Sequence, residues 1–77
     1  MMISLYSIAQ GPDAKQLHEN ARTFMRQGDY SNAILVLNRG LQLEPNNIEL
    51  SKDLALNYFF QKDNTKALEI IKPVLER

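Results

Sequence analysis

The sequence contains no cysteine and only one histidine, His18, among its 77 residues. Without cysteine the chain forms no disulfide and offers no thiolate to a metal, and one histidine is too few for a zinc site made by the protein alone. The acidic residues are scattered, with no pair at a spacing typical of acid–base catalysis, and there is no glycine-rich phosphate loop. We therefore expect no enzyme, no catalytic residues, no cofactor and no metal site.

An excess of charge of one sign is also missing. Nine lysine and arginine residues balance nine aspartate and glutamate residues, so the formal net charge is zero. A neutral chain has no global attraction for nucleic acid, and no apolar run is long enough to span a bilayer. The hydrophobic fraction of 44% and the charged fraction of 23% are ordinary for a single small globular domain. We expect neither a nucleic-acid partner nor a membrane span.

The N-terminal segment, residues 1–12, differs from the rest because Met1 to Gln10 is apolar and uncharged. Ser7-Ile8-Ala9 resembles the small-x-small end of a secretory signal peptide, although no basic region precedes it and the apolar run is short. Three interpretations stay open: a signal-peptide remnant at Met1–Ala9, an ordered segment that caps an exposed apolar face, and a frayed or vector-derived end. The first predicts a periplasmic or secreted protein, and the others predict a cytoplasmic one.

After Gly11-Pro12 the apolar residues recur at the three- and four-residue spacing of helices. The predicted helices run from Ala14 to the stop at Gly28, from the cap Asp29 to Leu43, from about Ile48 to Gln61, and from about Thr65 to Glu76. Asp13 is the cap of the first helix, where Gln16 completes a capping box, and Asn47 is the cap of the third. Pro73 lies inside the fourth helix, so we expect either a kink or a poorly formed last turn.

A pattern of eight residues returns along the chain at an offset of 34 residues, because Gln27–Ile34 is matched by Gln61–Leu68. The same offset relates small, aromatic and aliphatic residues: Ala21 and Ala55, Phe24 and Tyr58, Leu37 and Ile71, and Leu41 and Leu75. Self-similarity at this period indicates one supersecondary unit used twice. Stacked units of this kind present a surface for binding more often than a site for catalysis.

These residues resemble the tetratricopeptide repeat, a 34-residue unit of two helices. The first unit carries the pattern at Leu17, Ala21, Phe24, Gly28, Tyr30, Ala33, Leu37 and Pro45, and the second at Ala55, Tyr58, Ala67 and Ile71. The sequence departs from the pattern at Ser51, where a large residue is usual, at Lys62 and Asn64, where Gly and Tyr are usual, and at Gly40, where Ala is usual. The departures at Lys62 and Asn64 make the second turn the less secure one, and glycine at position 40 weakens its helix by roughly 1 kcal/mol relative to alanine.

The resemblance implies an all-α fold in which two tandem helix-turn-helix repeats form four antiparallel helices in a right-handed α-α superhelical stack. The repeats would span residues 13–47 and 48–77, the second being truncated. The paired alanines, Ala21 with Ala33 and Ala55 with Ala67, would let the two helices of each unit approach closely. Tyr30 would pack near its turn and against the neighbouring unit.

The resemblance also implies a protein-protein interaction module, whose concave groove binds a peptide or helix of a partner protein. The partner-binding residues mapped by position are Lys15, His18, Arg22, Met25, Arg26, Glu49, Lys52, Leu56, Phe59 and Phe60. The alternative to partner binding is that the lysines and arginines simply form a solvated face. Tyr58, Phe59 and Phe60 run consecutively, so a helix cannot bury all three, and at least one should be exposed.

Two further hypotheses follow from the same residues. The fourth helix carries more apolar surface, at Ile70, Ile71, Val74 and Leu75, than the third helix alone can cover. The chain is then either part of a larger repeat protein or a structural, self-associating unit, such as a helix-exchanged homo-oligomer without a separate ligand. The resemblance also implies a comparison with family members that clamp a C-terminal carboxylate, and the matching positions here are His18, Arg22 and Asp53. We do not expect such a clamp, because Asp53 would repel a carboxylate and the third repeat that completes the clamp is missing.

Overall fold

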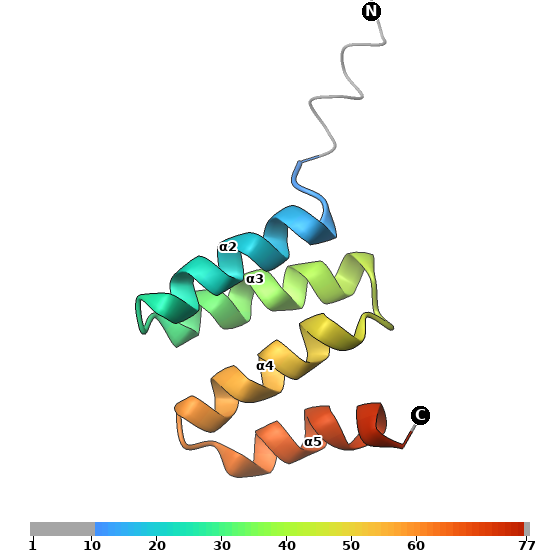
Figure 1. The fold of residues 1–77 in the computed structure, drawn as a ribbon. Coiled ribbons are helices and arrows are strands. Elements are labelled where there is room, and N and C mark those ends of the chain that lie inside the picture. The colour runs from blue at the N-terminus through green and yellow to red at the C-terminus, as the bar shows by residue number, and fades with distance from the viewer. Residues whose placement is uncertain (1–10, 77) are drawn as a thin grey trace, which may run out of the picture.

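The computed structural model describes residues 11–76, and every regular element in that range is an α-helix (Figure 1). The helices are α2 (Ala14–Arg26), α3 (Tyr30–Leu43), α4 (Ile48–Phe60) and α5 (Asn64–Leu75). The predicted all-α class and the four predicted helices are therefore confirmed. The interpretations of the segment before Gly11 lie outside the described residues.

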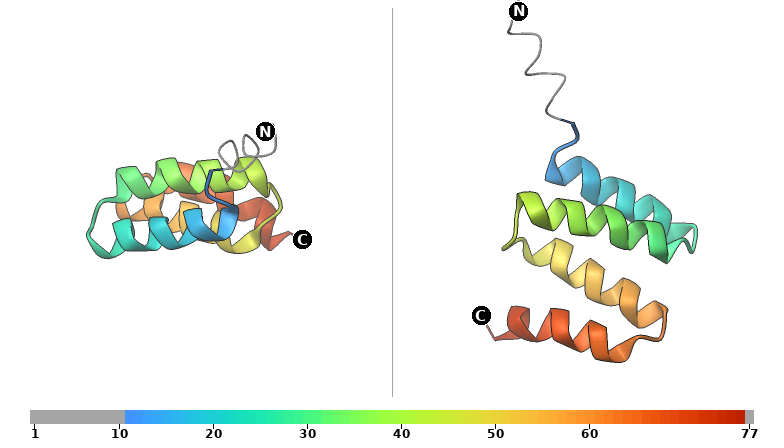
Figure 2. Two further views of the ribbon diagram at one scale, coloured as in Figure 1. Left: turned by 90° about the horizontal axis from the view of Figure 1, so that it is seen from above. Right: turned by 180° about the vertical axis from the view of Figure 1, so that it is seen from behind.

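Successive helices pack against one another in chain order: α2 on α3, α3 on α4, and α4 on α5. Figures 1 and 2 show the stack from three sides, with α2 and α5 as its outer helices. We call α2–α3 the first hairpin and α4–α5 the second hairpin. The junction between the hairpins is formed mainly by α3 and α4, and α2 also contacts α4 through His18 and Asp53. Among the described helices, α5 packs chiefly on α4.

Each helix begins at an acidic or amide side chain that accepts a hydrogen bond from the backbone N–H three residues later. The four bonds are Gln16 N to Asp13 Oδ1 at 2.8 Å, Asn32 N to Asp29 Oδ1 at 3.4 Å, Leu50 N to Asn47 Oδ1 at 3.0 Å, and Lys66 N to Asp63 Oδ1 at 3.1 Å. The predicted capping box is only half formed. The Gln16 side chain donates to Asn20 Oδ1 at 3.2 Å, one turn along the helix, and not back to Asp13.

The two hairpin turns have the same backbone although their sequences differ. Gly28 has φ +76° and Lys62 has φ +67°, so both occupy the left-handed region that ends a helix. Each turn has the same two bonds: Gly28 N to Met25 O at 3.0 Å and Asp29 N to Phe24 O at 2.9 Å in one, and Lys62 N to Phe59 O at 2.8 Å and Asp63 N to Tyr58 O at 2.9 Å in the other. The departure from the repeat pattern at Lys62 therefore leaves the turn geometry unchanged.

The last turn of α5 is formed despite Pro73. The helix continues to Leu75, and the N–H of Glu76 donates to Lys72 O at 3.1 Å. A proline in a helix interior removes one backbone donor and clashes with the preceding turn, so this helix is held at a local cost of about 3 kcal/mol.

The core lies between the helices and is built around the predicted alanines. Ala21, Ala33, Ala55 and Ala67 are all buried. Buried leucines surround those of the first hairpin, with Leu37 on α3 and Leu50 on α4 fully inaccessible. The alanines therefore lie inside the stack, as the repeat pattern predicts.

Gly40 has a packing reason that the sequence did not reveal. It is buried in α3, and a Cβ atom at this position would lie 3.1 Å from Leu50 Cδ1 on α4. Glycine thus allows α3 and α4 to approach closely, so its poor helix propensity, about 1 kcal/mol relative to alanine, is offset by this contact.

Candidate functional site

The ten predicted partner-binding residues lie on the two helices that open the hairpins. Residues 15, 18, 22, 25 and 26 are on α2, and residues 49, 52, 56, 59 and 60 are on α4. We call these ten residues the α2–α4 set. Eight of them are exposed, and only His18 and Met25 are half-buried. The set therefore combines accessible cations on α2 with accessible apolar side chains on α4.

The polar part of the set is organised by Asp53, which joins α4 to α2. His18 Nε2 lies 2.7 Å from Asp53 Oδ2, and because a carboxylate only accepts, the imidazole donates this hydrogen bond. Arg22 Nε lies 3.8 Å from the same oxygen. All three clamp positions thus come together, but with the carboxylate on the protein side. Asp53 holds His18 and screens Arg22, which agrees with the sequence argument against a carboxylate clamp.

The three consecutive aromatic residues of α4 have different environments. Phe60 packs on Tyr30 of α3, with ring centroids 5.0 Å apart and ring planes tilted by 35°. This contact crosses the junction between the hairpins and confirms the predicted position of Tyr30. Tyr58 is half-buried, with the Lys66 ammonium 6.0 Å from its ring centroid. Phe59 is 56% exposed and is the most accessible of the three, as expected for a run that no single neighbour can bury.

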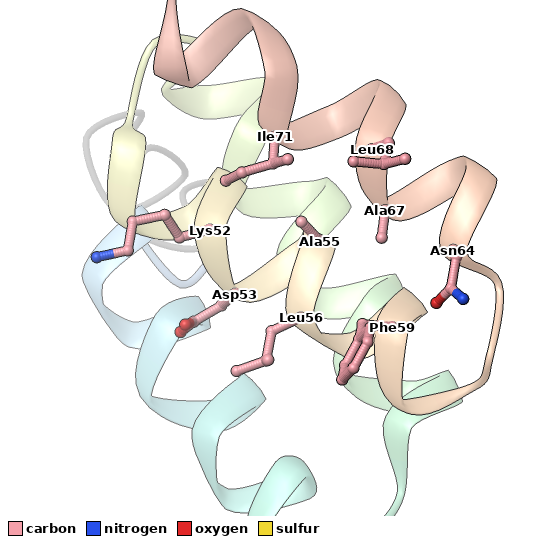
Figure 3. Close-up of a pocket in the computed structure, with 9 residues that line it drawn as sticks. All are labelled: Lys52, Asp53, Ala55, Leu56, Phe59, Asn64, Ala67, Leu68 and Ile71. Carbon is pink, nitrogen blue, oxygen red and sulfur yellow. The ribbon is translucent and has the colours of Figure 1, made fainter.

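A groove of about 580 Å³ lies between α4 and α5 (Figure 3). We call it the α4–α5 groove. Six of its nine lining residues are apolar, and the full set is Lys52, Asp53, Ala55, Leu56, Phe59, Asn64, Ala67, Leu68 and Ile71. In Figure 3 Lys52 and Asp53 stand at one end and Asn64 at the other, with the apolar side chains between them. The groove therefore has the size and lining of a binding site for an apolar ligand surface.

Sequence reasoning identified only part of this groove. Lys52, Leu56 and Phe59 were among the predicted residues, whereas the contribution of α5 was treated only as surplus apolar surface. Leu68 was missed as a site residue although it is 64% exposed. Its signal is its register: it lies 34 residues after Ile34, a position that is buried in the first hairpin.

Asn57 is a second residue that the sequence analysis missed. Its side chain is fully buried in α4, and its Nδ2 donates to Asp53 O at 2.7 Å. Its Oδ1 accepts no hydrogen bond from any residue that the structure describes. The spacing gave a signal, since Asn57 follows the buried Leu50 by seven residues and so shares its helix face.

Residues 11–76 contain neither a candidate metal site nor a candidate membrane span. No group of three or more His, Cys, Asp or Glu side chains in that range is arranged to hold a metal ion. None of the described helices is both long and apolar enough to cross a bilayer. Among the described residues, the α2–α4 set and the α4–α5 groove are therefore the candidate functional sites.

Comparison with known proteins gives one family. No curated protein and no solved structure matches the chain. The model of the tetratricopeptide repeat matches residues 24–77, which is more than half of the sequence. Repeats of this kind generally serve as protein-protein interaction modules and are typically non-catalytic. With four helices packed pairwise in two hairpins and this match, the chain belongs to the tetratricopeptide repeat family.

Proposed function

We propose that this protein binds a peptide or helix of a partner protein along the α2–α4 set. The observation that carries the proposal is the exposure of Phe59 and Leu56, two large apolar side chains on α4 that are 56% and 40% exposed. Clustered exposed apolar side chains on a small protein mark interaction surfaces. Both residues are among the partner-binding positions that the family resemblance implies.

The charges of the set indicate the chemistry of the partner. Lys15, Arg22 and Arg26 are exposed on α2, while the apolar residues lie on α4. Asp53 neutralises part of the positive charge next to Arg22, so Lys15 and Arg26 supply most of the attraction. An acidic segment that carries one bulky apolar residue would place its charges against α2 and its apolar side chain against Phe59.

Site-specific photo-crosslinking tests this proposal. A photoreactive phenylalanine analogue replaces Phe59 in one sample and Leu35 in the matched control, since Leu35 on α3 is equally accessible, at 63%, but lies outside the set. We expect a discrete partner adduct from position 59 and also from Arg22 replaced in the same way, and none from position 35. Equal yields from all three positions, or no adduct from position 22, would contradict the proposal.

Self-association is the second candidate function, because Leu68 and Leu75 expose apolar surface on the outer helix α5. Light scattering on the purified chain distinguishes the two. A binding module has the mass of one chain in solution, and exchanging Phe59 for Ala removes the partner without changing that mass. A self-associating unit has the mass of two or more chains, and the exchange changes it.

A further inference from the structure

The α4–α5 groove corresponds to a surface that is covered in the first hairpin. Shifting by 34 residues relates Ala55, Ala67, Leu68 and Ile71, which line the groove, to Ala21, Ala33, Ile34 and Leu37. Those four residues are buried and belong to one core cluster with Leu50 and Leu54 of α4. The first hairpin is thus covered by a helix, α4, at the position where the second hairpin has its groove.

The opposite end of the stack is polar. The α2 residues that correspond to the side of α4 facing the first hairpin are Gln16, Glu19, Asn20 and Thr23, and all are exposed. At the positions of Leu50 and Leu54, α2 therefore has Gln16 and Asn20. Such a surface cannot fill an apolar groove without burying unpaired amides, so α2 of a second copy is a poor occupant.

We propose that the α4–α5 groove binds an amphipathic helix of a partner protein, seated on the second hairpin as α4 is seated on the first. The central anchor of this helix is a leucine at the position of Leu54, because Leu54 packs in the core cluster with Ala21 and Ile34. Helix-in-groove recognition through apolar residues at helical spacing is a recurring mode of protein binding. In this mode α4 itself is the template for the ligand.

The comparison with α4 also indicates where the bound helix carries a negative charge. Asp53 of α4 accepts the hydrogen bond from His18, and Lys52 occupies the position of His18 in the second hairpin. Lys52 Nζ lies 3.9 Å from Glu49 Oε2, in an exposed ion pair on the same helix. A helix seated in the groove with an acidic residue just before its anchoring leucine would therefore place that carboxylate next to the Lys52 ammonium.

One difference between the hairpins restricts the size of one residue of the bound helix. Leu50 packs where Gly40 has no side chain, whereas the corresponding residue of α5 is Val74. A leucine at the Leu50 position of the bound helix would meet the Val74 side chain. The ligand therefore carries a small residue there, which gives the chemistry small-x-x-acidic-Leu.

The probe is a labelled peptide with the sequence of residues 47–62, added to the full chain and followed by fluorescence anisotropy. We expect saturable binding of one peptide per chain, and tighter binding when the peptide carries Leu50→Ala. Leu68→Glu in the protein should weaken binding more than roughly ten-fold, because it would bury a charge against the peptide. Leu35→Glu is the matched control on α3, with the same exposure, and should leave binding unchanged.

Exchanging the charges of Lys52 in the protein and Asp53 in the peptide gives a second measurement, which tests the ion pair and not the shape of the groove. Lys52→Glu in the protein should weaken binding of the unaltered peptide by roughly five-fold. Asp53→Lys in the peptide should restore the binding to this variant. Equal binding to the Leu68→Glu and unaltered chains would overturn the inference. So would a homodimer that Leu68→Glu dissociates while no peptide binds.

This inference goes beyond the proposed function because it depends on α5, whereas the α2–α4 set does not include that helix. The two fail separately. A chain that yields the crosslink from Arg22 but binds no peptide refutes the helix seat alone. Because Phe59 also lines the groove, the crosslink from Arg22 is the one that separates the two sites. A chain that binds the peptide but yields no crosslink from Arg22 refutes the proposed function alone.

Discussion

The two hairpins carry one pattern but bury it differently. Ile34 is 8% exposed in the first hairpin, and its counterpart Leu68 is 64% exposed in the second. Leu41 is half-buried, whereas its counterpart Leu75 is 76% exposed. The difference arises because α4 covers α3, while no described residue covers the outer side of α5. Burial in this protein is therefore set by the next helix in the stack and not by the hairpin itself.

The largest expected effect comes from truncating the buried aliphatic residue in the middle of α3, and the corresponding change in α5 should be smaller. Leu37→Ala should lower the free energy of unfolding by about 2–5 kcal/mol, because Leu37 is fully buried. Ile71→Ala, at the same repeat position beside the groove, should cost clearly less, since that side chain is already partly exposed. Urea denaturation followed by far-UV circular dichroism measures both. Equal losses would show that the second hairpin is covered as well as the first.

Replacing an alanine by a larger residue tests the same difference in packing between the two hairpins, by adding side-chain volume instead of removing it. Ala33→Leu should destabilise by about 1–3 kcal/mol, because Ala33 is fully buried between helices and the insertion overpacks the core. Ala67→Leu should be much better tolerated, since Ala67 borders a groove with space for added atoms. Thermal melts of the two variants rank these effects. A collapse of the Ala67→Leu variant at lower temperature than Ala33→Leu would contradict the comparison.

The turns give a smaller effect of opposite sign in the two hairpins. Lys62→Gly should stabilise by about 1 kcal/mol, because a side chain in the left-handed region is strained and glycine is not. Gly28→Ala should destabilise by about 1 kcal/mol through that strain alone, since no atom lies within 4 Å of the added Cβ. Chemical denaturation of both variants checks the pair. If Lys62→Gly lowers the midpoint, the Lys62 side chain contributes a contact that outweighs its backbone strain.

The last expected effect, no larger than that of the turns, concerns the link between α2 and α4. Asp53→Asn should cost about 1 kcal/mol, because it weakens a part-buried hydrogen bond to His18 and removes the charge near Arg22. Glu49→Gln is the matched control on the same helix. Its 3.9 Å contact with Lys52 is exposed, so the change should fall within about 0.5 kcal/mol. Indistinguishable denaturation midpoints for Asp53→Asn and the unaltered chain would show that the hydrogen bond adds no net stability.

Most of the fold was readable in the sequence because it depends on local signals. Caps such as Asp29 and Asn47 fix where helices begin, and the repeated alanines identify which faces meet. The role of Gly40 was not readable, since it depends on how closely Leu50 of another helix approaches. The left-handed turn at Lys62 was also obscured, because the hydrogen bonds of the turn hold a residue type that the position does not favour.

The candidate site was less predictable than the fold. Phe59 and Leu56 follow from the repeat register, but the pairing of His18 with Asp53 depends on side-chain conformations across two helices. The groove itself exists because no described helix packs against this side of α4 and α5, and no spacing within a single helix encodes that. Only the comparison of Leu68 with Ile34 across the repeat would have identified α5 as part of the site.

Methyl NMR during a peptide titration tests the central claim most directly, namely that the second hairpin offers the helix seat that α4 occupies on the first. The ligand is the peptide of residues 47–62 with Leu50→Ala, added to the full chain with labelled Ile and Leu methyl groups. We predict that the signals of Leu68 and Ile71 shift and saturate, while those of Ile34 and Leu37 stay in place. Shifts of Ile34 and Leu37 at the same peptide concentration, or no shift of Leu68, would contradict the account.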